Sequence, residues 1–188
     1  MSHLRNISRA LAPGAFVLIL ALAGCGGGGG SKTASDATPA EPAGKGEVGT
    51  QAPAFELADL NGEKVSSSTL TGKVVILDFW ATWCPPCKAE VPHFVALQEK
   101  YGSQGLAIVG LSLDAGGAAD VAPFAKEYKV NYTMLVGADD VAKAYGGINS
   151  IPTTFVIDRQ GKIVKRFVGF IAPEVFEETI APLLAATS

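Results

Sequence analysis

Residues 77–88 read LDFWATWCPPCK, and the interpretation of the chain starts from them. An apolar run at 74–83 leads directly into a Cys-x-x-Cys motif, Cys84 and Cys87, and a helix-compatible segment at 88–101 follows. Two thiols separated by two residues can close a small disulfide, and the N-terminus of a helix stabilises the first of them as a thiolate. This strand–turn–helix setting indicates thiol-disulfide exchange.

The first 24 residues have the pattern of a secretory signal peptide. Arg5 and Arg9 stand near the start with no acidic residue beside them, and residues 11–23 are apolar with small side chains. This apolar stretch is shorter than the roughly 20 residues that a membrane-spanning helix needs. We expect a signal peptide at 1–24, with a transmembrane anchor as the alternative.

Residues 22–25 read LAGC and resemble the bacterial lipobox, in which cleavage precedes a cysteine that becomes lipidated. The chain has three cysteines, and the one outside the Cys-x-x-Cys motif, Cys25, stands at the lipobox position. Several acyl chains on Cys25 would anchor the protein stably, whereas one chain binds a membrane only marginally. Cleavage elsewhere, which would leave Cys25 a free thiol, is the alternative. Gly26 replaces the aspartate that retains many lipoproteins in the inner membrane, which favours the outer membrane.

Residues 25–47 form a tether according to their composition, which is rich in Gly, Ser, Thr, Ala and Pro. Such a segment cannot bury enough apolar surface to fold. The remaining residues, 48–188, have the size of one ordinary domain. Without residues 1–24 the chain has 13 basic and 18 acidic side chains, a net charge of −5, and no basic cluster. We therefore expect no nucleic-acid partner and a monomeric protein.

The pattern along residues 48–188 is that of an α/β protein. Residues 74–79 and 106–113 are apolar almost throughout, as in parallel strands that are buried on both faces. Asn61-Gly62 and residues 158–161 have the composition of hairpin turns. The expected elements are strands at 54–57, 64–66, 74–79, 106–113, 133–136, 153–157 and 163–170, and helices at 88–101, 118–128, 139–145 and 173–185. They predict a mixed sheet flanked by helices.

Two motifs in the right order carry a resemblance to the thioredoxin superfamily. Residues 77–88 resemble its active site, and residues 147–155, GINSIPTTF, resemble its cis-proline loop. The longer segment between them, which includes 114–128, the entry at 48–55 and the lipoprotein start are similar to the membrane-tethered TlpA/ResA-like, or DsbE-like, branch. The resemblance covers 48–184 and implies a thioredoxin-like fold. In that fold an N-terminal hairpin precedes the central mixed sheet, and an insertion lies between the two motifs.

The resemblance implies catalytic roles for Cys84, Cys87 and Asp78. Cys84, at the helix start, is expected to attack a partner disulfide, and Cys87 to resolve the mixed disulfide. A thiol of pKa about 8.5 is only about 3 per cent thiolate at pH 7, whereas one lowered to about 7 is half ionised. Asp78 is expected to assist proton removal from Cys87, and burial should raise its pKa. A purely structural, hydrogen-bonded acid is the alternative.

The resemblance also implies a substrate-binding surface made of Trp83, Ile151 and Pro152. Pro152 is expected to be cis and to lie against Cys84, leaving the Ile151 backbone free to pair with an extended substrate. A trans proline that opens a strand is the alternative. Trp83 is expected to cover the thiol site, while Trp80 is expected to pack in the core.

Three other residues of the active-site helix receive simpler interpretations. Glu90 recurs in this branch and would modulate the site, but a solvated helix face is the simpler expectation. His93 is likewise expected at the surface. Pro92 is expected to kink the helix.

Other uses of the two thiols fit the sequence less well. A structural disulfide across so small a loop would stabilise the fold by only about 2 kcal/mol. Structural zinc usually needs four ligands, and His93 is the only histidine outside the signal peptide. We therefore expect no metal and no cofactor. A copper-binding module is possible because Cu(I) prefers soft ligands, but the CxxxC and placed histidine of the copper-assembly branch are missing.

A thiol peroxidase shares the fold and the style of entry at 48–55, but its motif is Pro-x-x-x-Thr-x-x-Cys. Ala81 stands where Cys84 would need the threonine, and Cys84 stands where Cys87 would need it. The resemblance instead implies an envelope reductant of the cytochrome c maturation type. Such a protein would be lipid-anchored, would face the periplasm, and would receive electrons from an upstream membrane donor. Its partners would be proteins with disulfides or thiols.

Overall fold

The computed structural model describes residues 45–186. The expected signal peptide (1–24), the expected lipidation site Cys25 and most of the expected tether (25–47) lie outside the described residues. Within the described part of the chain, no helix has both the length and the apolar character that a membrane crossing requires.

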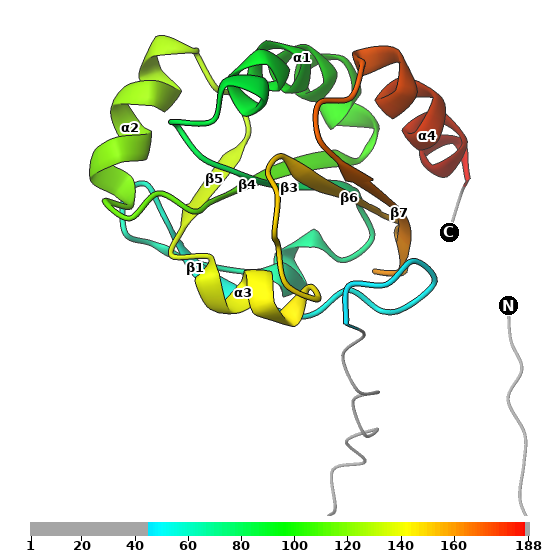
Figure 1. Cartoon of the computed structure of the whole chain (residues 1–188). Coiled ribbons are helices and arrows are strands. Elements are labelled where there is room, and N and C mark those ends of the chain that lie inside the picture. Colours follow the sequence, from blue (N-terminus) through cyan, green and yellow to red (C-terminus); the bar gives the residue numbers. More distant parts are fainter. Residues whose placement is uncertain (1–44, 187–188) are drawn as a thin grey trace, which may run out of the picture. The chain divides into compact units, whose positions relative to one another are not determined.

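A seven-stranded mixed sheet forms the centre of the domain (Figure 1), in the order β2-β1-β5-β4-β3-β6-β7. The strands are β1 (Glu56–Asp59), β2 (Lys64–Ser66), β3 (Val74–Trp80), β4 (Leu106–Ser112), β5 (Thr133–Val136), β6 (Thr153–Ile157) and β7 (Ile163–Val168). β3, β4 and β5 are parallel to one another, and the other neighbours pair antiparallel. The expected mixed sheet is confirmed.

Helices cover both faces of this sheet. They are α1 (Pro85–Tyr101), α2 (Ala118–Glu127), α3 (Asp139–Ala144) and α4 (Pro173–Ala185), with short 3-10 turns at Ser67–Leu70 and Gly102–Gln104. Figure 1 shows α1 and α4 over one face and α3 against the other. The domain therefore has the layered arrangement expected of a thioredoxin-like fold.

β3 is buried along its whole length, which explains why its sequence is apolar almost throughout. Because side chains alternate along a strand, β3 supplies two separate cores. Val75 and Leu77 belong to the cluster on the α3 side. Val74 and Ile76 belong to the cluster beneath α1 and α4. The same alternation turns Asp78 toward the face that α1 covers.

The expected N-terminal hairpin is present, displaced by two residues on its first strand. β1 and β2 pair antiparallel, with Leu57 opposite Val65. The Asp59 carboxylate accepts the N–H groups of Asn61 (2.8 Å) and Glu63 (2.9 Å), and these bonds close the turn after β1. The side chain of Asp59 thus completes the turn that the Asn-Gly pair predicts.

Two further boundaries differ from expectation by two or more residues, and each has a local reason, whereas the ends of β3, β4, α2 and α3 differ by one residue. α1 begins at Pro85 instead of residue 88, because proline fits the first helical turn, where an N–H has no partner. β7 ends at Val168 instead of residue 170, because Gly169 has a φ of 85° and donates its N–H to the Pro152 carbonyl at 2.8 Å. This bond joins the end of β7 to the cis-proline loop.

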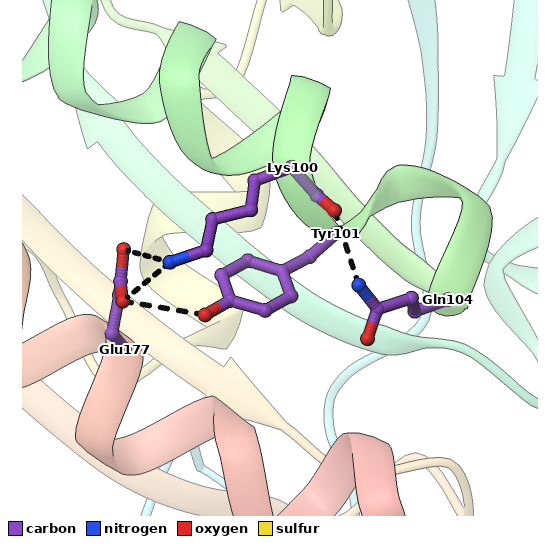
Figure 2. A network of polar contacts seen from close by, with 4 residues as sticks. All are labelled: Lys100, Tyr101, Gln104 and Glu177. Atoms are coloured by element: carbon purple, nitrogen blue, oxygen red, sulfur yellow. Dashed lines mark hydrogen bonds and ion pairs between the residues drawn. The ribbon is translucent and has the colours of Figure 1, made fainter.

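The C-terminal end of α1 contacts α4 through a polar network (Figure 2). The Lys100 ammonium lies 2.9 and 3.1 Å from the two Glu177 carboxylate oxygens, and the Tyr101 hydroxyl donates to Glu177 at 3.2 Å. Gln104 donates to the Lys100 carbonyl at 3.2 Å. These contacts are largely exposed, so the apolar packing beneath them supplies most of the attachment between α1 and α4.

Candidate active site

Cys84 and Cys87 form a disulfide at the N-terminus of α1. Cys84 is the N-cap residue, and its sulfur accepts the Cys87 N–H at 3.3 Å. Pro85 and Pro86 occupy the first two helical positions. Unpaired N–H groups and the helix dipole at this end stabilise negative charge on the Cys84 sulfur once the disulfide is reduced.

The loop that precedes β6 closes over the disulfide. The Ile151–Pro152 peptide bond is cis, as the resemblance to thioredoxin implies. The Ile151 carbonyl oxygen lies 3.7 Å from the Cys84 sulfur, and Cys84 is only 3% exposed. The structure therefore brings the first cysteine and the cis-proline loop together.

The two tryptophans beside the motif lie in opposite environments. Trp80 packs in the core at 1% exposure, as expected, whereas Trp83 is 66% exposed. Trp83 borders a shallow hollow of about 160 Å³ whose other lining residues are Leu113, Ile148, Asn149, Ser150 and Ile151. The Trp83 ring thus forms one wall of an apolar surface beside the cis-proline loop, and most of it faces solvent.

Asp78 is buried on β3 at 4% exposure, on the face that α1 covers. Its carboxylate accepts one hydrogen bond, from the Thr154 hydroxyl at 2.9 Å. Burial raises the pKa of Asp78 well above its ordinary range, and the charge of Glu90 raises it further, while the Thr154 bond lowers it. Burial and the Glu90 charge therefore favour the protonated form of Asp78 more than in an exposed aspartate.

The expectation that Glu90 lies on a solvated helix face is wrong. Glu90 is fully buried; one carboxylate oxygen accepts the Ile171 N–H at 2.7 Å, and the other has no partner among the described residues. Burial raises the pKa of Glu90 to about 7, although the Ile171 N–H lowers it. The segment before α4 covers this side of α1, which is why the side chain is removed from water.

The surface position expected for His93 is only partly right. His93 is half-buried, and its ring packs edge-on against Phe170 with 6.1 Å between ring centroids. Its Nδ1 atom is buried without a described partner. The segment around Phe170 thus covers both His93 and the buried acid one turn away.

The spacing of Glu90 contained a signal for its burial. The buried residues of α1 are Cys87, Glu90, Val91, Phe94 and Leu97, which follow the three- and four-residue steps of one helix face. Glu90 therefore shares a face with Cys87. A third buried acid, which the sequence analysis did not single out, is Asp114, directly after β4.

Asp78 and Glu90 belong to one internal group of acids. Tyr132 is the third member: burial raises its pKa well above the ordinary range, and the charges of Asp78 and Glu90 raise it further. All three groups are thus disfavoured in their charged forms. Among the described residues, no three His, Cys, Asp or Glu side chains gather as a possible metal site.

Comparison with known proteins identifies this arrangement. Residues 48–166 match the family model described as AhpC/TSA. The chain belongs to the AhpC/TSA family. The thiol-disulfide oxidoreductase ResA of Bacillus subtilis is 38% identical over 139 residues, which cover 72% of this chain and 76% of ResA.

Solved structures place the chain more narrowly within the AhpC/TSA family. A Chlorobium tepidum protein assigned as thiol:disulfide interchange protein DsbE is 35% identical, with a TM-score of 0.69 over 74% of this chain and 99% of that one. StoA of Bacillus subtilis is 29% identical, with a TM-score of 0.58 over 67% of this chain and 95% of that one. The chain is a thioredoxin-like thiol-disulfide oxidoreductase, and these relatives favour neither a peroxidase nor a copper-binding module.

Proposed function

We propose that this oxidoreductase reduces disulfides in partner proteins through Cys84 and Cys87. The observation that carries the proposal is the position of the Cys84 sulfur, at the N-cap of α1 and 3.7 Å from the Ile151 carbonyl of the cis-proline loop. The helix N-terminus favours the thiolate that attacks, and the loop offers backbone groups to an incoming extended chain.

The proposed reaction has two exchange steps. The Cys84 thiolate attacks one sulfur of the partner disulfide, and the other partner sulfur leaves as a thiolate that takes up a proton. Cys87 then loses its proton and attacks the Cys84 sulfur, which releases the second partner sulfur. The partner gains two electrons and two protons, and the enzyme is left with the Cys84–Cys87 disulfide.

Asp78 is the proposed acceptor of the Cys87 proton. Two features support this role: Asp78 lies on the face of β3 that α1 covers, and burial raises its pKa well above the ordinary range. A carboxylate with a raised pKa is a stronger base toward a thiol than an ordinary aspartate is. Glu90, buried on the same helix face as Cys87, is the neighbour whose charge makes Asp78 a stronger base.

The proposed substrate surface is made of Ile151, Pro152 and Trp83. The partner chain would lie along the cis-proline loop, with the residue beside its cysteine in the apolar hollow that Trp83 borders. A 66% exposed tryptophan supports this role, because large amphipathic rings of this kind are favoured contact residues.

The location and partners proposed here follow from the sequence. We propose a signal peptide at 1–24, a lipid anchor at Cys25 with a tether to residue 47, and a periplasm-facing domain at 48–188. Gly26 favours the outer membrane over the inner membrane. An upstream membrane donor would re-reduce Cys84–Cys87, and the substrates would be envelope proteins of the cytochrome c maturation type.

The deciding experiment traps the partner. Cells that produce the full chain with Cys87→Ser should accumulate mixed disulfides through Cys84, because the resolving thiol is gone. Non-reducing gels and mass spectrometry would identify the trapped proteins, with Cys84→Ser as the matched control. Adducts that form in Cys84→Ser instead would reverse the two roles.

The reduction potential of the Cys84–Cys87 pair tests the proposed direction of electron flow. Equilibration of the purified full chain with glutathione buffers should give a potential nearer the −270 mV of thioredoxin than the roughly −120 mV of the oxidant DsbA. A potential near that of DsbA would mean that the protein oxidises partner thiols and does not reduce partner disulfides.

A further inference from the structure

Asp114 is a buried acid outside the thiol site whose carboxylate accepts hydrogen bonds from both Thr82 and Ser112. Its carboxylate accepts the Thr82 backbone N–H at 3.0 and 3.2 Å, the Thr82 hydroxyl at 2.5 Å, and the Ser112 hydroxyl at 2.8 Å. Its own N–H donates to the Ser112 hydroxyl at 3.0 Å. Asp114 is 6% exposed, so these contacts form largely away from water.

The pairing of β3 with β4 explains why these two residues meet. The strands are parallel and in register, with Trp80 opposite Ser112, and the Leu113 N–H still donates to the Trp80 carbonyl at 3.0 Å. The next bond of a regular ladder would take the Thr82 N–H to a backbone carbonyl beyond β4. The Asp114 side chain accepts that N–H instead, at the point where the two strands diverge.

Thr82 belongs to the short loop that carries the reactive sulfur. Residues 81–83 connect β3 to Cys84, and the Cys84 N–H donates back to the Ala81 carbonyl at 3.2 Å. The hydrogen bonds from Thr82 to Asp114 therefore fix the middle of this loop. Its start continues from β3, and its end leads into α1. Trp83 and Cys84 follow Thr82 directly, so the position of Thr82 controls both.

We propose that Asp114 is a positioning residue for thiol-disulfide exchange, which sets the place of Cys84 and Trp83 relative to the cis-proline loop through its bonds to Thr82. This inference rests on the proposed function, since it assumes a partner chain that binds along the cis-proline loop. Asp114 itself touches neither sulfur in any described contact, so it acts through Thr82. Exchange with a protein that must pair with the loop depends on this geometry, whereas a small disulfide needs only an accessible thiolate.

Two substrates separate positioning from general damage to the fold. The purified full chain is reduced, freed of reductant, and mixed with either insulin or the small disulfide 5,5′-dithiobis(2-nitrobenzoate) in single-turnover experiments. The insulin rate divided by the small-disulfide rate is the readout. Because a misplacement of about 1 Å can cost about a hundredfold in rate, we expect Asp114→Ala to lower this ratio at least about tenfold.

Conservative and control variants complete the set. Asp114→Asn keeps an oxygen that accepts the Thr82 N–H and should recover most of the ratio. Asp139→Asn, the same change at an exposed acid on α3, should match the unmodified protein. If Asp114→Ala does not fold, Thr82→Val decides, because it removes only the hydroxyl contact and should lower the ratio about threefold, on the order of 0.65 kcal/mol.

The outcomes distinguish the two proposals. A folded Asp114→Ala with an unchanged ratio overturns the positioning role, as does an unchanged ratio in Thr82→Val when Asp114→Ala is unfolded. An equal fall of both rates also overturns it, because that result reports a general defect of the thiol. If the unmodified protein reduces the small disulfide but not insulin, the proposed function fails, and the positioning role fails with it.

Discussion

Two acids near opposite ends of α1, Glu90 of α1 itself and Glu177 of α4, lie in opposite environments. At the C-terminal end, the Glu177 carboxylate meets Lys100 in solvent, and the Lys100 hydrogen bond lowers the pKa of Glu177. At the N-terminal end, beside the disulfide, Glu90 is buried and its pKa is raised to about 7. An exposed acid beside a lysine stays charged over the physiological pH range. A buried acid without a cation can exchange protons near neutral pH, which is the property that thiol chemistry uses.

The contact between α1 and α4 and the proposed thiol chemistry therefore depend on different groups of residues. The exposed network in Figure 2 lies between α1 and α4, but pairs of this kind contribute little to stability. The buried acids are costly to ionise, so a fold that only needed stability would place apolar side chains there. Four substitutions, in α4, β3 and α1, can show whether the two ends differ in this way.

The largest expected effect is on the free energy of unfolding, from the apolar contact between α1 and α4 beneath the exposed network. Phe176 of α4 is 1% exposed, and its ring meets Phe94 of α1 edge-on with 5.2 Å between centroids. Phe176→Ala should lower the free energy of unfolding by about 3–5 kcal/mol, because it removes buried area and leaves a cavity. Urea denaturation of the oxidised protein measures this. A loss below about 1 kcal/mol would show that the polar network, not the apolar core, attaches α4.

The next effect concerns the proton acceptor proposed at the N-terminal end. Asp78→Asn should slow the resolving step about a hundredfold at pH 7, because the Cys87 proton loses its acceptor. Stopped-flow measurement of product release from a preformed mixed disulfide isolates this step. Asp140→Asn, an exposed acid on α3, is the matched control. Equal resolving rates in both variants would leave Asp78 with a structural role.

Glu90 tests the comparison through the pH dependence of stability. Its folded-state pKa of about 7 exceeds the ordinary 4.5, so the folded state binds more protons than the unfolded state between these pH values. Its contribution to the free energy of unfolding therefore falls as pH rises through this window. Glu90→Gln, which keeps an oxygen for the Ile171 N–H, should remove this fall and stabilise the protein at pH 8 by about 3 kcal/mol.

The measurement is urea denaturation of the oxidised protein at pH 5 and pH 8. Glu90→Gln should differ little from the unmodified protein at pH 5, where the upper part of the window has not yet titrated. A destabilisation at pH 8 would mean that an uncharacterised partner compensates the Glu90 charge and that the two ends of α1 do not differ as described.

The sequence contained most of the fold and the thiol site because both depend on local patterns. β5, β6 and α4 begin and end where apolar periodicity and turn residues predict, and Cys84 with Pro152 carry recognisable motifs. Glu90 was expected to be exposed because Ile171, which contacts its carboxylate and belongs to the segment that buries it, lies 81 residues away in sequence. A helix pattern shows which residues share a face, but tertiary contacts decide how far the buried face extends.

The contact between Asp114 and Thr82 could not be predicted from the sequence for a related reason. Its partner Thr82 lies 32 residues away, and only the register of two parallel strands brings them together. A run of apolar residues predicts that a strand is buried but does not give its register with a neighbour. Side chains that act across the ends of two strands are therefore visible only in the assembled sheet.

The smallest expected effect is at the exposed end of α1, and it completes the comparison. Glu177→Gln removes the charge that meets Lys100 but keeps an oxygen for the Tyr101 hydroxyl. Because the pKa of Glu177 is lowered in the folded protein, its contribution to stability is present above the unfolded pKa and is lost as pH falls below it, the opposite sign to Glu90. At pH 7 the melting temperature should change by less than about 2 °C, since exposed pairs contribute little, and the insulin reduction rate should be unchanged. Differential scanning calorimetry and the single-turnover assay measure both quantities. A rate change of tenfold would mean that the charge at this end reaches the thiol site along α1, and attachment and chemistry would then no longer be separate.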